Sequence, residues 1–195
     1  TKSDWIKKGL VNKKSYEKGL RGTFEKQHKR LLQHPKKVSP YFIPTMISDI
    51  ASGHISIKYG FKGINYAIVS ACATGTHAIG NAYRQIKYGD ADIMVAGGSE
   101  ASITPISIAG FSNMKALTKN PDINSASRPF DLNRNGFVMG EGAGILVLEN
   151  KDHALKRNAN ILCEISGYGA TADAYHLTSP TPGGLGAIKS MEIAL

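Results

Sequence analysis

The fold is decided by residues 64–98, "INYAIVSACATGTHAIGNAYRQIKYGDADIMVAGG". Apolar runs at 64–71 and 91–98 open and close this stretch, and each predicts a buried strand. Between them, apolar residues recur at helical spacing over 74–88, and Gly89 then marks the end of a helix. A strand, a helix and a strand in this order predict a βαβ unit with parallel strands, and therefore a fold of the α/β class.

The remaining chain continues this alternation of strands and helices. Two further apolar runs predict strands at 142–150 and 159–170. Helical spacing predicts helices over 45–58, 104–117, 151–158 and from 185 onward. Polar segments with Gly and Pro predict loops at 117–136 and 173–184, and residues 1–33 predict a basic, weakly amphipathic helical stretch.

The composition is that of an ordinary globular protein. The chain has 195 residues, of which 42% are hydrophobic and 20% charged, enough for one domain with a sizeable core. No apolar run reaches the length of a membrane span, and the lysine-rich N-terminus lacks the apolar segment of a signal peptide. The six histidines are scattered without metal-ligand spacing, so we expect no metal site.

The positive charge is concentrated at one end of the sequence. The net charge is +9, and residues 1–40 carry all of this excess with 12 Lys/Arg against 3 Asp/Glu. A solvated lysine-rich surface explains this pattern, and a docking face for an acidic partner is the alternative. We do not expect nucleic-acid binding, because few aromatic residues interleave with the lysines and no nucleic-acid-binding motif is present.

Cys72 stands where the first predicted strand ends and the helix begins. The free N–H groups and the dipole of a helix N-terminus favour a thiolate, and small neighbouring residues leave the sulfur approachable. The pattern therefore predicts a nucleophile, and a small buried thiol is the alternative. Cys163 is expected to be part of the core. His77 follows Cys72 within the helix, and we expect it at the helix surface.

One long stretch, "VSACATGTHAIGNAYRQIKYGDADIMVAGGSEA" (69–101), resembles the active-site region of the β-ketoacyl-[acyl-carrier-protein] synthases. The likeness continues in three further blocks, "GFSNMKAL" (110–117), "ASRPFDLNRNGFVMGEGAGILVLE" (126–149) and "GYGATADAYHLTSP" (167–180). It covers about residues 34–195, and "DAYHLTSP" is similar to the type II elongating synthases. The basic stretch 1–33 matches poorly.

The resemblance implies a thiolase-like α/β fold, layered α-β-α-β-α, and a homodimer. Residues 1–195 would then be a partial ketoacyl-synthase domain, with the N-terminal half and the start of the C-terminal half. The implied activity is fatty-acid chain elongation by decarboxylative Claisen condensation. Cys72 takes an acyl group as a thioester, malonyl-acyl-carrier protein loses CO2, and its carbanion attacks the thioester to give 3-oxoacyl-acyl-carrier protein. No dissociable cofactor is expected, since the phosphopantetheine arm arrives on the acyl-carrier protein.

The resemblance also implies roles for further residues. Phe111 would be a phenylalanine of the acyl pocket, and Phe42 and Ile43 would reach that pocket from a second subunit. Asp173, His176 and Thr178 would belong to a mobile loop at the substrate entrance. Basic positions that would dock the acidic acyl-carrier protein near the entrance are Lys36, Lys37 and Lys115. Ordinary core, a simple loop and solvated lysines remain the alternatives for these positions.

Members of the family are longer than this chain, and the resemblance places two histidines, a lysine and a glycine-rich oxyanion loop in a second half. We therefore expect a fragment that holds the nucleophile, lacks the complete reaction and exposes core surface. The alternatives are a thiolase that uses coenzyme A and a non-catalytic partner of the chain-length-factor kind, against which Cys72 argues. A bacterial cytoplasm is the simplest compartment. The Lys/Asn-rich composition also suits a plastid-type organelle, an apicoplast or chloroplast.

Overall fold

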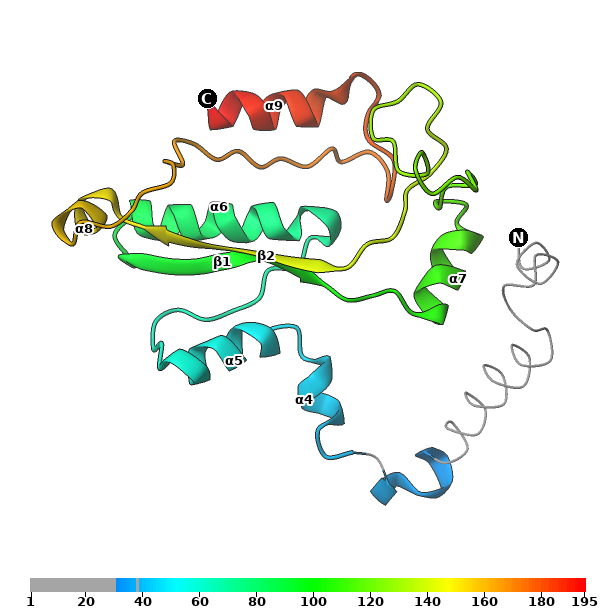
Figure 1. Ribbon diagram of the computed structural model, residues 1–195, viewed down its shortest axis with the longest axis horizontal. Coiled ribbons are helices and arrows are strands. Elements are labelled where there is room, and N and C mark those ends of the chain that lie inside the picture. Colours follow the sequence, from blue (N-terminus) through cyan, green and yellow to red (C-terminus); the bar gives the residue numbers. More distant parts are fainter. Residues whose placement is uncertain (1–30, 38) are drawn as a thin grey trace. The chain divides into compact units, whose positions relative to one another are not determined.

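The computed structural model describes residues 31–37 and 39–195, which form two compact units (Figure 1). The first unit comprises the described residues of Thr1–Gly60 together with Ile108–Phe137, and the second comprises Phe61–Ser107 together with Val138–Leu195. Most of the basic stretch predicted over 1–33 lies outside the described residues. In the described part of the chain, no helix combines the length and the apolar character that crossing a membrane requires.

The sheet of the second unit is an antiparallel pair of strands. β1 (Ile93–Glu100) and β2 (Gly142–Glu149) lie side by side, with Val95 opposite Val147 and Met94 opposite Leu148. Both strands were predicted from their apolar runs, β1 within two residues of the expected start and end and β2 within one. Their antiparallel pairing was not predicted, because an apolar run does not specify its neighbour.

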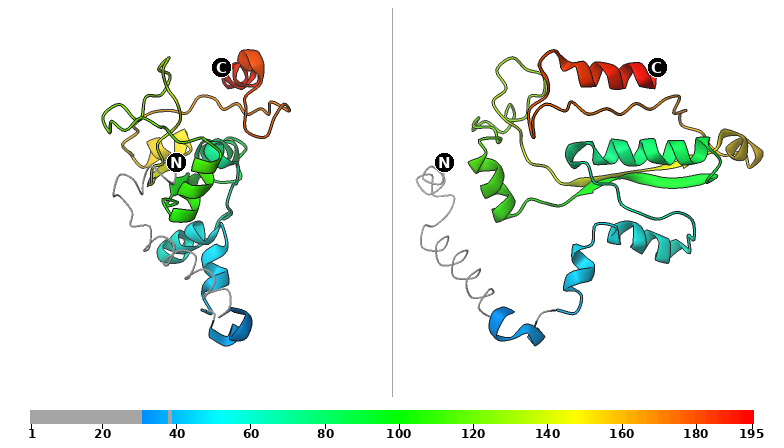
Figure 2. Two further views of the ribbon diagram at one scale, coloured as in Figure 1. Left: turned by 90° about the vertical axis from the view of Figure 1, so that its right-hand side faces the viewer. Right: turned by 180° about the vertical axis from the view of Figure 1, so that it is seen from behind.

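Helix α6 (Thr74–Lys87) covers one face of this sheet, as both views in Figure 2 show. The helix predicted over 74–88 is therefore confirmed. Its predicted apolar stripe is also confirmed, since each member is buried or half-buried: Ala78, Ile79, Ala82, Tyr83 and Ile86. At the start of α6 the backbones approach closely, because a Cβ built on Gly98 would lie 3.2 Å from the Cα of Gly75. Glycine at these two positions lets the helix rest directly on β1.

The other side of α6 meets an extended segment that runs on toward helix α9 (Leu185–Ala194) (Figure 1). The ring of Tyr168 packs over Gly80 of α6, where a Cβ would come within 2.1 Å of the ring. Gly167 and Gly169 lie equally close to the backbone of α9. Sheet, α6, extended segment and α9 therefore form successive layers in the second unit, and glycines allow the closest approaches between them.

Helix α8 (Lys151–Lys156) follows β2 directly and is fixed to it by polar contacts. The Asn150 side chain caps the helix by accepting the backbone N–H groups of Asp152 and His153. Glu149 accepts two hydrogen bonds from the Arg157 guanidinium, at 2.7 and 2.5 Å, and lies 2.5 Å from Nδ1 of His153. These contacts, Arg157 first and His153 second, lower the pKa of Glu149 from 4.5 to about 2.

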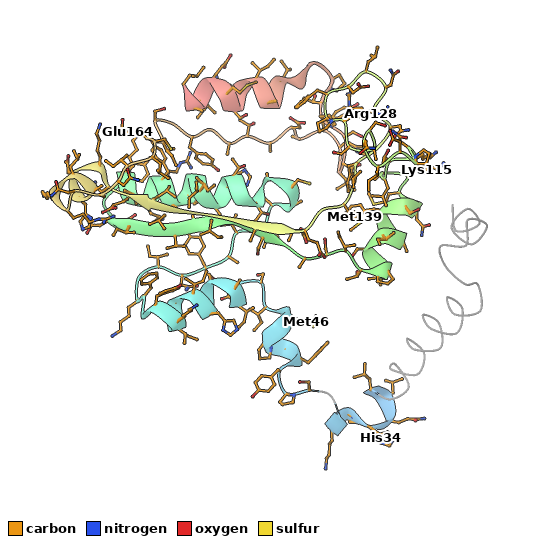
Figure 3. The ribbon with its side chains drawn as sticks, in the orientation of Figure 1. His34, Met46, Lys115, Arg128, Met139 and Glu164 are labelled. Carbon is orange, nitrogen blue, oxygen red and sulfur yellow. The ribbon has the colours of Figure 1, made fainter. Side chains whose placement is uncertain are left out.

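A second ion pair joins α8 to the extended segment that follows it. Lys151 contacts Glu164, whose side chain is labelled in Figure 3. The Glu164 carboxylate raises the pKa of Lys151, first through the hydrogen bond and then through its charge. Both side chains are exposed, so this pair contributes little to stability.

The first unit is built from short helices and a long loop. Its elements include η2 (Pro35–Lys37), α4 (Phe42–Met46), α5 (Ile50–Tyr59) and the end of α7 (Pro105–Asn113), which begins in the second unit. The loop predicted over 117–136 is confirmed as irregular chain, and an isolated bridge between Leu117 and Phe137 closes it. Within this loop, hydrogen bonds from Ser125 and Asn124 lower the pKa of Asp122.

Two predicted strands are absent from the structure. Neither 64–71 nor 159–170 pairs in a β-ladder among the described residues, so both strand predictions are wrong. The predicted parallel βαβ unit, which needed 64–71 as its first strand, is wrong with them. An apolar run indicates a tendency toward burial, but a strand forms only where a neighbour takes up its backbone hydrogen bonds. β1 and β2 satisfy each other's backbone hydrogen bonds. In the described chain, residues 64–71 and 159–170 have no neighbouring strand that could do the same.

Two helix predictions need new boundaries. The helix predicted over 45–58 is divided into α4 and α5, because Ile47 between them is extended at φ −75° and ψ 126°. The helix predicted over 104–117 ends at Asn113, and Lys115 beyond it adopts a positive φ of 57°. The short helix after β2 and the helix from 185 onward are confirmed as α8 and α9.

Few apolar side chains are buried. Among the described residues, the buried apolar set is Ala82, Leu148 and Ala154. Apolar strand residues remain open to solvent, such as Val147 with 67% of its surface exposed and Ile145 with 51%. The predicted exposure of core surface is therefore seen directly.

The packing of Tyr168 on α6 can be tested with one methyl group. We expect Gly80→Ala to destabilise the protein by about 1–3 kcal/mol, because the new Cβ collides with the ring. Gly75→Ala in the same helix is the matched control, since its Cβ makes ordinary contact with Gly98 at 3.7 Å and alanine favours helix. Urea denaturation measures both, and equal losses would contradict the packing argument.

The carboxylate at the end of β2 predicts a pH dependence of stability. Because folding lowers the pKa of Glu149 from 4.5 to about 2, its contribution is complete above pH 4.5 and is lost as the pH falls toward 2. The difference in unfolding free energy between wild type and Glu149→Gln should therefore shrink over this range in urea titrations. Arg157→Gln removes the larger cause of the shift and should remove most of the same pH dependence. A constant difference would refute the assignment.

Candidate active site

Cys72 lies on a tight turn at the N-terminal end of α6. The turn is η3 (Ala71–Ala73), and Thr74 directly after it begins the helix. Ala71 adopts a positive φ of 49°, a region that non-glycine residues rarely occupy. Cys72 is exposed and its thiol is free. The turn therefore presents a sulfur to solvent at the start of a helix, the arrangement that the sequence predicts for a nucleophile.

Hydrogen bonds within the turn hold this conformation. The backbone N–H of Ser70 donates to Oγ1 of Thr74 at 2.9 Å, and the Thr74 hydroxyl donates to the carbonyl of Ala71 at 2.8 Å. The backbone N–H of Ala73 donates to the carbonyl of Ser70 at 3.1 Å. Thr74 thus closes the turn from both sides, and the positive φ at Ala71 is compensated by these bonds.

His77 differs from its prediction as a helix-surface residue. Its ring is half-buried, and Nδ1 lies 2.6 Å from Oγ of Ser70, one residue before the turn. The edge of the ring also faces Tyr168, with centroids 6.5 Å apart. Neither Ser70 nor Tyr168 was predicted as a site residue. The spacing of seven residues between Ser70 and His77, across the start of a helix, is the signal that could have identified that pair.

Cys163 also differs from its prediction. It was expected in the core of a strand, whereas it is exposed and lies in the extended segment outside any strand. The reason is the same as for the missing strand, since no neighbouring strand covers this segment in the described chain. Cys163 is therefore a second accessible thiol, and it lies outside any helix.

The predicted entrance loop is a closed structure in the second unit. Oδ2 of Asp173 accepts the backbone N–H of Thr181 at 2.9 Å, and the Thr171 hydroxyl donates to the carbonyl of Gly186 at 2.6 Å. Inside the loop, Nδ1 of His176 accepts the backbone N–H groups of Thr178 and Ser179, each at 3.1 Å. The structure therefore brings His176 and Thr178 together, whereas Asp173 bonds to Thr181 where the loop closes.

The tautomer of His176 follows from these contacts. Because Nδ1 accepts two hydrogen bonds, the proton of the neutral ring is assigned to Nε2. The side chain of Leu177, next to His176, is fully exposed. The loop thus holds the His176 ring in place by hydrogen bonds and leaves the apolar Leu177 side chain open to solvent.

The predicted acyl-pocket residues lie in the first unit. Phe111, in α7, is half-buried and packs edge-on against Phe137 with ring centroids 5.1 Å apart. Phe42 and Ile43 open helix α4 and have 48% and 63% of their surfaces exposed. Phe111 therefore has a packed environment, whereas Phe42 and Ile43 have surface available for a further contact.

The predicted basic positions also belong to the first unit. Lys36 and Lys37 lie in η2, and Lys36 is exposed. Lys115 follows α7 and is also exposed (Figure 3). Cys72 lies in the second unit, so a common site with these lysines or with Phe111 stays a prediction. In the described part of the chain, no three His, Cys, Asp or Glu side chains gather as they would around a metal ion.

A family model described as "Beta-ketoacyl synthase, N-terminal domain" matches residues 13–154, which include the turn, α6 and both strands. The chain belongs to the β-ketoacyl synthase family. The match begins inside the basic N-terminal stretch and ends in α8. The resemblance read from the active-site blocks is thereby confirmed.

Relatives of this synthase chain carry consistent names. It is 51% identical over 192 residues to a Staphylococcus aureus protein named 3-oxoacyl-[acyl-carrier-protein] synthase 2, an alignment that covers 98% of this chain and 46% of the relative. It is 53% identical over 162 residues to an Arabidopsis thaliana protein named 3-oxoacyl-[acyl-carrier-protein] synthase, mitochondrial, covering 82% of this chain and 35% of the relative. The chain thus spans less than half the length of these relatives.

Solved structures of the family share the fold. A complex of a type II PKS acyl-carrier protein with its ketosynthase matches with a TM-score of 0.79 and 38% identity, over 83% of this chain and 40% of that chain. A β-ketoacyl synthase from Burkholderia phymatum matches with a TM-score of 0.77 and 34% identity, over 86% of this chain and 41% of that chain. The predicted thiolase-like α/β fold is confirmed.

The hydrogen bond between Asp173 and the Thr181 N–H closes the predicted entrance loop and should protect it from proteolysis. We expect Asp173→Ala to accelerate chymotrypsin cleavage beside Tyr175 and Leu177 several-fold, because the bond to the Thr181 N–H is lost and the loop opens locally. Asp173→Asn keeps an acceptor oxygen and should be cleaved nearly as slowly as wild type. Mass spectrometry of the fragments locates the cuts. Indistinguishable rates for all three proteins would show that this bond does not restrain the loop.

Proposed function

We propose that this chain carries the acyl-accepting nucleophile, Cys72, of a synthase that elongates fatty-acid chains. The observation that supports this most is the exposed thiol on a strained turn at the N-terminus of α6, inside the block matched by the family model. The names of the relatives in Staphylococcus aureus and Arabidopsis thaliana support the same reaction. Because the chain spans less than half of those relatives, the complete condensation is proposed for a protein that includes the rest of the fold.

The first stage is acyl transfer to sulfur. The Cys72 thiolate attacks the thioester carbonyl of an acyl-acyl-carrier protein, and the tetrahedral intermediate collapses by expelling the thiolate of the carrier's phosphopantetheine arm. One thioester replaces another, so the step is nearly balanced in free energy. The backbone N–H of Cys72, at the start of α6, is a candidate donor to the oxyanion.

The second stage forms the carbon–carbon bond. Malonyl-acyl-carrier protein loses CO2, and the resulting carbanion attacks the acyl-Cys72 carbonyl. The Cys72 thiolate leaves, and the product is a 3-oxoacyl-acyl-carrier protein two carbons longer than the original acyl group. We assign this stage to the complete synthase, since the groups that stabilise the carbanion are expected from its second half.

The remaining predicted residues take supporting roles in this proposal. Phe111, with Phe42 and Ile43 from a second subunit of a homodimer, would line the acyl pocket and keep water from the thioester. The loop with Asp173, His176 and Thr178 would contact the phosphopantetheine arm at the entrance. No dissociable cofactor is required, because the carrier protein brings the arm.

An acyl-carrier protein is the proposed partner. A related ketosynthase was solved in complex with a type II PKS acyl-carrier protein. Acyl-carrier proteins are acidic, and exposed Lys36 and Lys115, together with Lys37, provide positive charge for steering them. This attraction should weaken as salt is added, because exposed charges are screened.

Intact-protein mass spectrometry tests the nucleophile directly. After mixing with palmitoyl-acyl-carrier protein, we expect wild type and Cys163→Ala to gain one palmitoyl mass, and Cys72→Ala to gain none. Both thiols are exposed, so Cys163 controls for unselective acylation. Palmitoyl-coenzyme A offered in parallel distinguishes a thiolase-type enzyme, which would prefer it. Acylation that persists in Cys72→Ala would disprove the assignment.

A further inference from the structure

The turn that carries Cys72 is closed by its own hydrogen bonds. Ala71 costs free energy at a positive φ of 49°, of order 1–3 kcal/mol for a residue in a sparsely populated region, and the bonds through Thr74 compensate this cost. Thr74 is the first residue of α6, so these bonds reach only the start of the helix. They do not join the turn to the body of α6.

The contact between Ser70 and His77 supplies the missing connection. Ser70 precedes the turn, and His77 lies in the body of α6, seven residues further along the chain. Their Oγ and Nδ1 atoms are 2.6 Å apart, a short hydrogen bond between half-buried side chains. Cys72 therefore lies on a chain segment anchored at both ends, by this bond and by the helix itself.

The ring of His77 is itself held by the layer behind α6. Its edge contacts Tyr168 at a centroid distance of 6.5 Å and an interplanar angle of 85°. The Tyr168 ring packs against Gly80, which has no side chain to push it away, and the Arg84 guanidinium lies 5.1 Å from the ring centroid. The contacts thus run from the extended segment through Tyr168 and His77 to Ser70.

We propose that Ser70 and His77 form a positioning pair that orients the Cys72 turn for attack on the acyl thioester. Neither residue is assigned contact with the substrate, and the proposal rests on the proposed role of Cys72 as the nucleophile. Attack on a carbonyl requires the sulfur at a defined distance and angle, and small misplacements are costly in rate. Alkylation by a small reagent requires only an accessible thiolate. The acylation rate therefore reports the orientation of the Cys72 sulfur, and the alkylation rate reports its reactivity alone.

The test uses variants of the full chain in a Cys163→Ala background. Ser70→Ala and His77→Leu each remove the hydrogen bond. Ser70→Thr keeps the hydroxyl, and His77→Asn places a polar atom near the position of Nδ1. For each variant we measure the rate of Cys72 acylation by palmitoyl-acyl-carrier protein, the rate of Cys72 alkylation by iodoacetamide, and hydrogen exchange of the amides of residues 70–74.

We expect Ser70→Ala and His77→Leu to slow acylation about tenfold while alkylation changes less than about twofold. Exchange at 70–74 should accelerate, and Ser70→Thr and His77→Asn should restore acylation. The double variant Ser70→Ala/His77→Leu should be no slower than the worse single variant, because both substitutions remove the same bond. If His77→Leu does not fold, the comparison of Ser70→Ala with Ser70→Thr carries the test, since it turns on one hydroxyl.

Two results would contradict the proposal that Ser70 and His77 act as a positioning pair. One is acylation unchanged in both single variants, and the other is single effects that multiply in the double variant. Failure of the proposed function looks different, because the parent chain would then not be acylated at Cys72 at all. In that case a role in acyl transfer falls with the proposed function. Exchange at 70–74 in Ser70→Ala then shows separately whether the bond holds the turn, since unchanged exchange rejects that hold as well.

Discussion

The close approach of α6 to β1 at Gly75 and Gly98 is the constraint on which the second unit depends. A side chain at Gly98 would press against the helix backbone, since its Cβ would lie 3.2 Å from the Cα of Gly75, whereas a Cβ on Gly75 would make ordinary contact at 3.7 Å. This contact lies three residues after Cys72, so it fixes the end of the helix that carries the proposed nucleophile. The two sides of α6 are then used differently, one for the sheet and the other for Tyr168.

Local pattern predicted the elements whose identity depends on local forces. Helix α6 follows from its apolar stripe and from Gly89, β2 follows from its apolar run, and α8 follows from helical spacing. The strands at 64–71 and 159–170 failed because pairing is a property of two segments, and the sequence of one does not contain it. The antiparallel register of β1 and β2 was missed for the same reason.

In the candidate site, too, local features could be predicted from the sequence and contacts between separate segments could not. The position of Cys72 at the start of a helix was predictable, because a cysteine between an apolar run and a helical pattern is a local signal. The contacts of Ser70 with His77 and of Glu149 with His153 and Arg157 join residues up to eight positions apart, and their value depends on burial that no single window shows. Tyr168 enters only through the packing of distant segments, so sequence alone gave no reason to single it out.

The exposure of Cys72 sets two opposing demands on the site. In the proposed reaction, a carrier-borne thioester reaches the sulfur only if the sulfur is open, whereas the transferred acyl group survives only if water is kept away. In the described residues the sulfur is open, and apolar side chains of the same unit, such as Val147 and Leu162, are open as well. Covering those side chains would gain free energy in proportion to the apolar area removed from water. The exposed apolar side chains of this unit therefore favour its burial against further apolar surface.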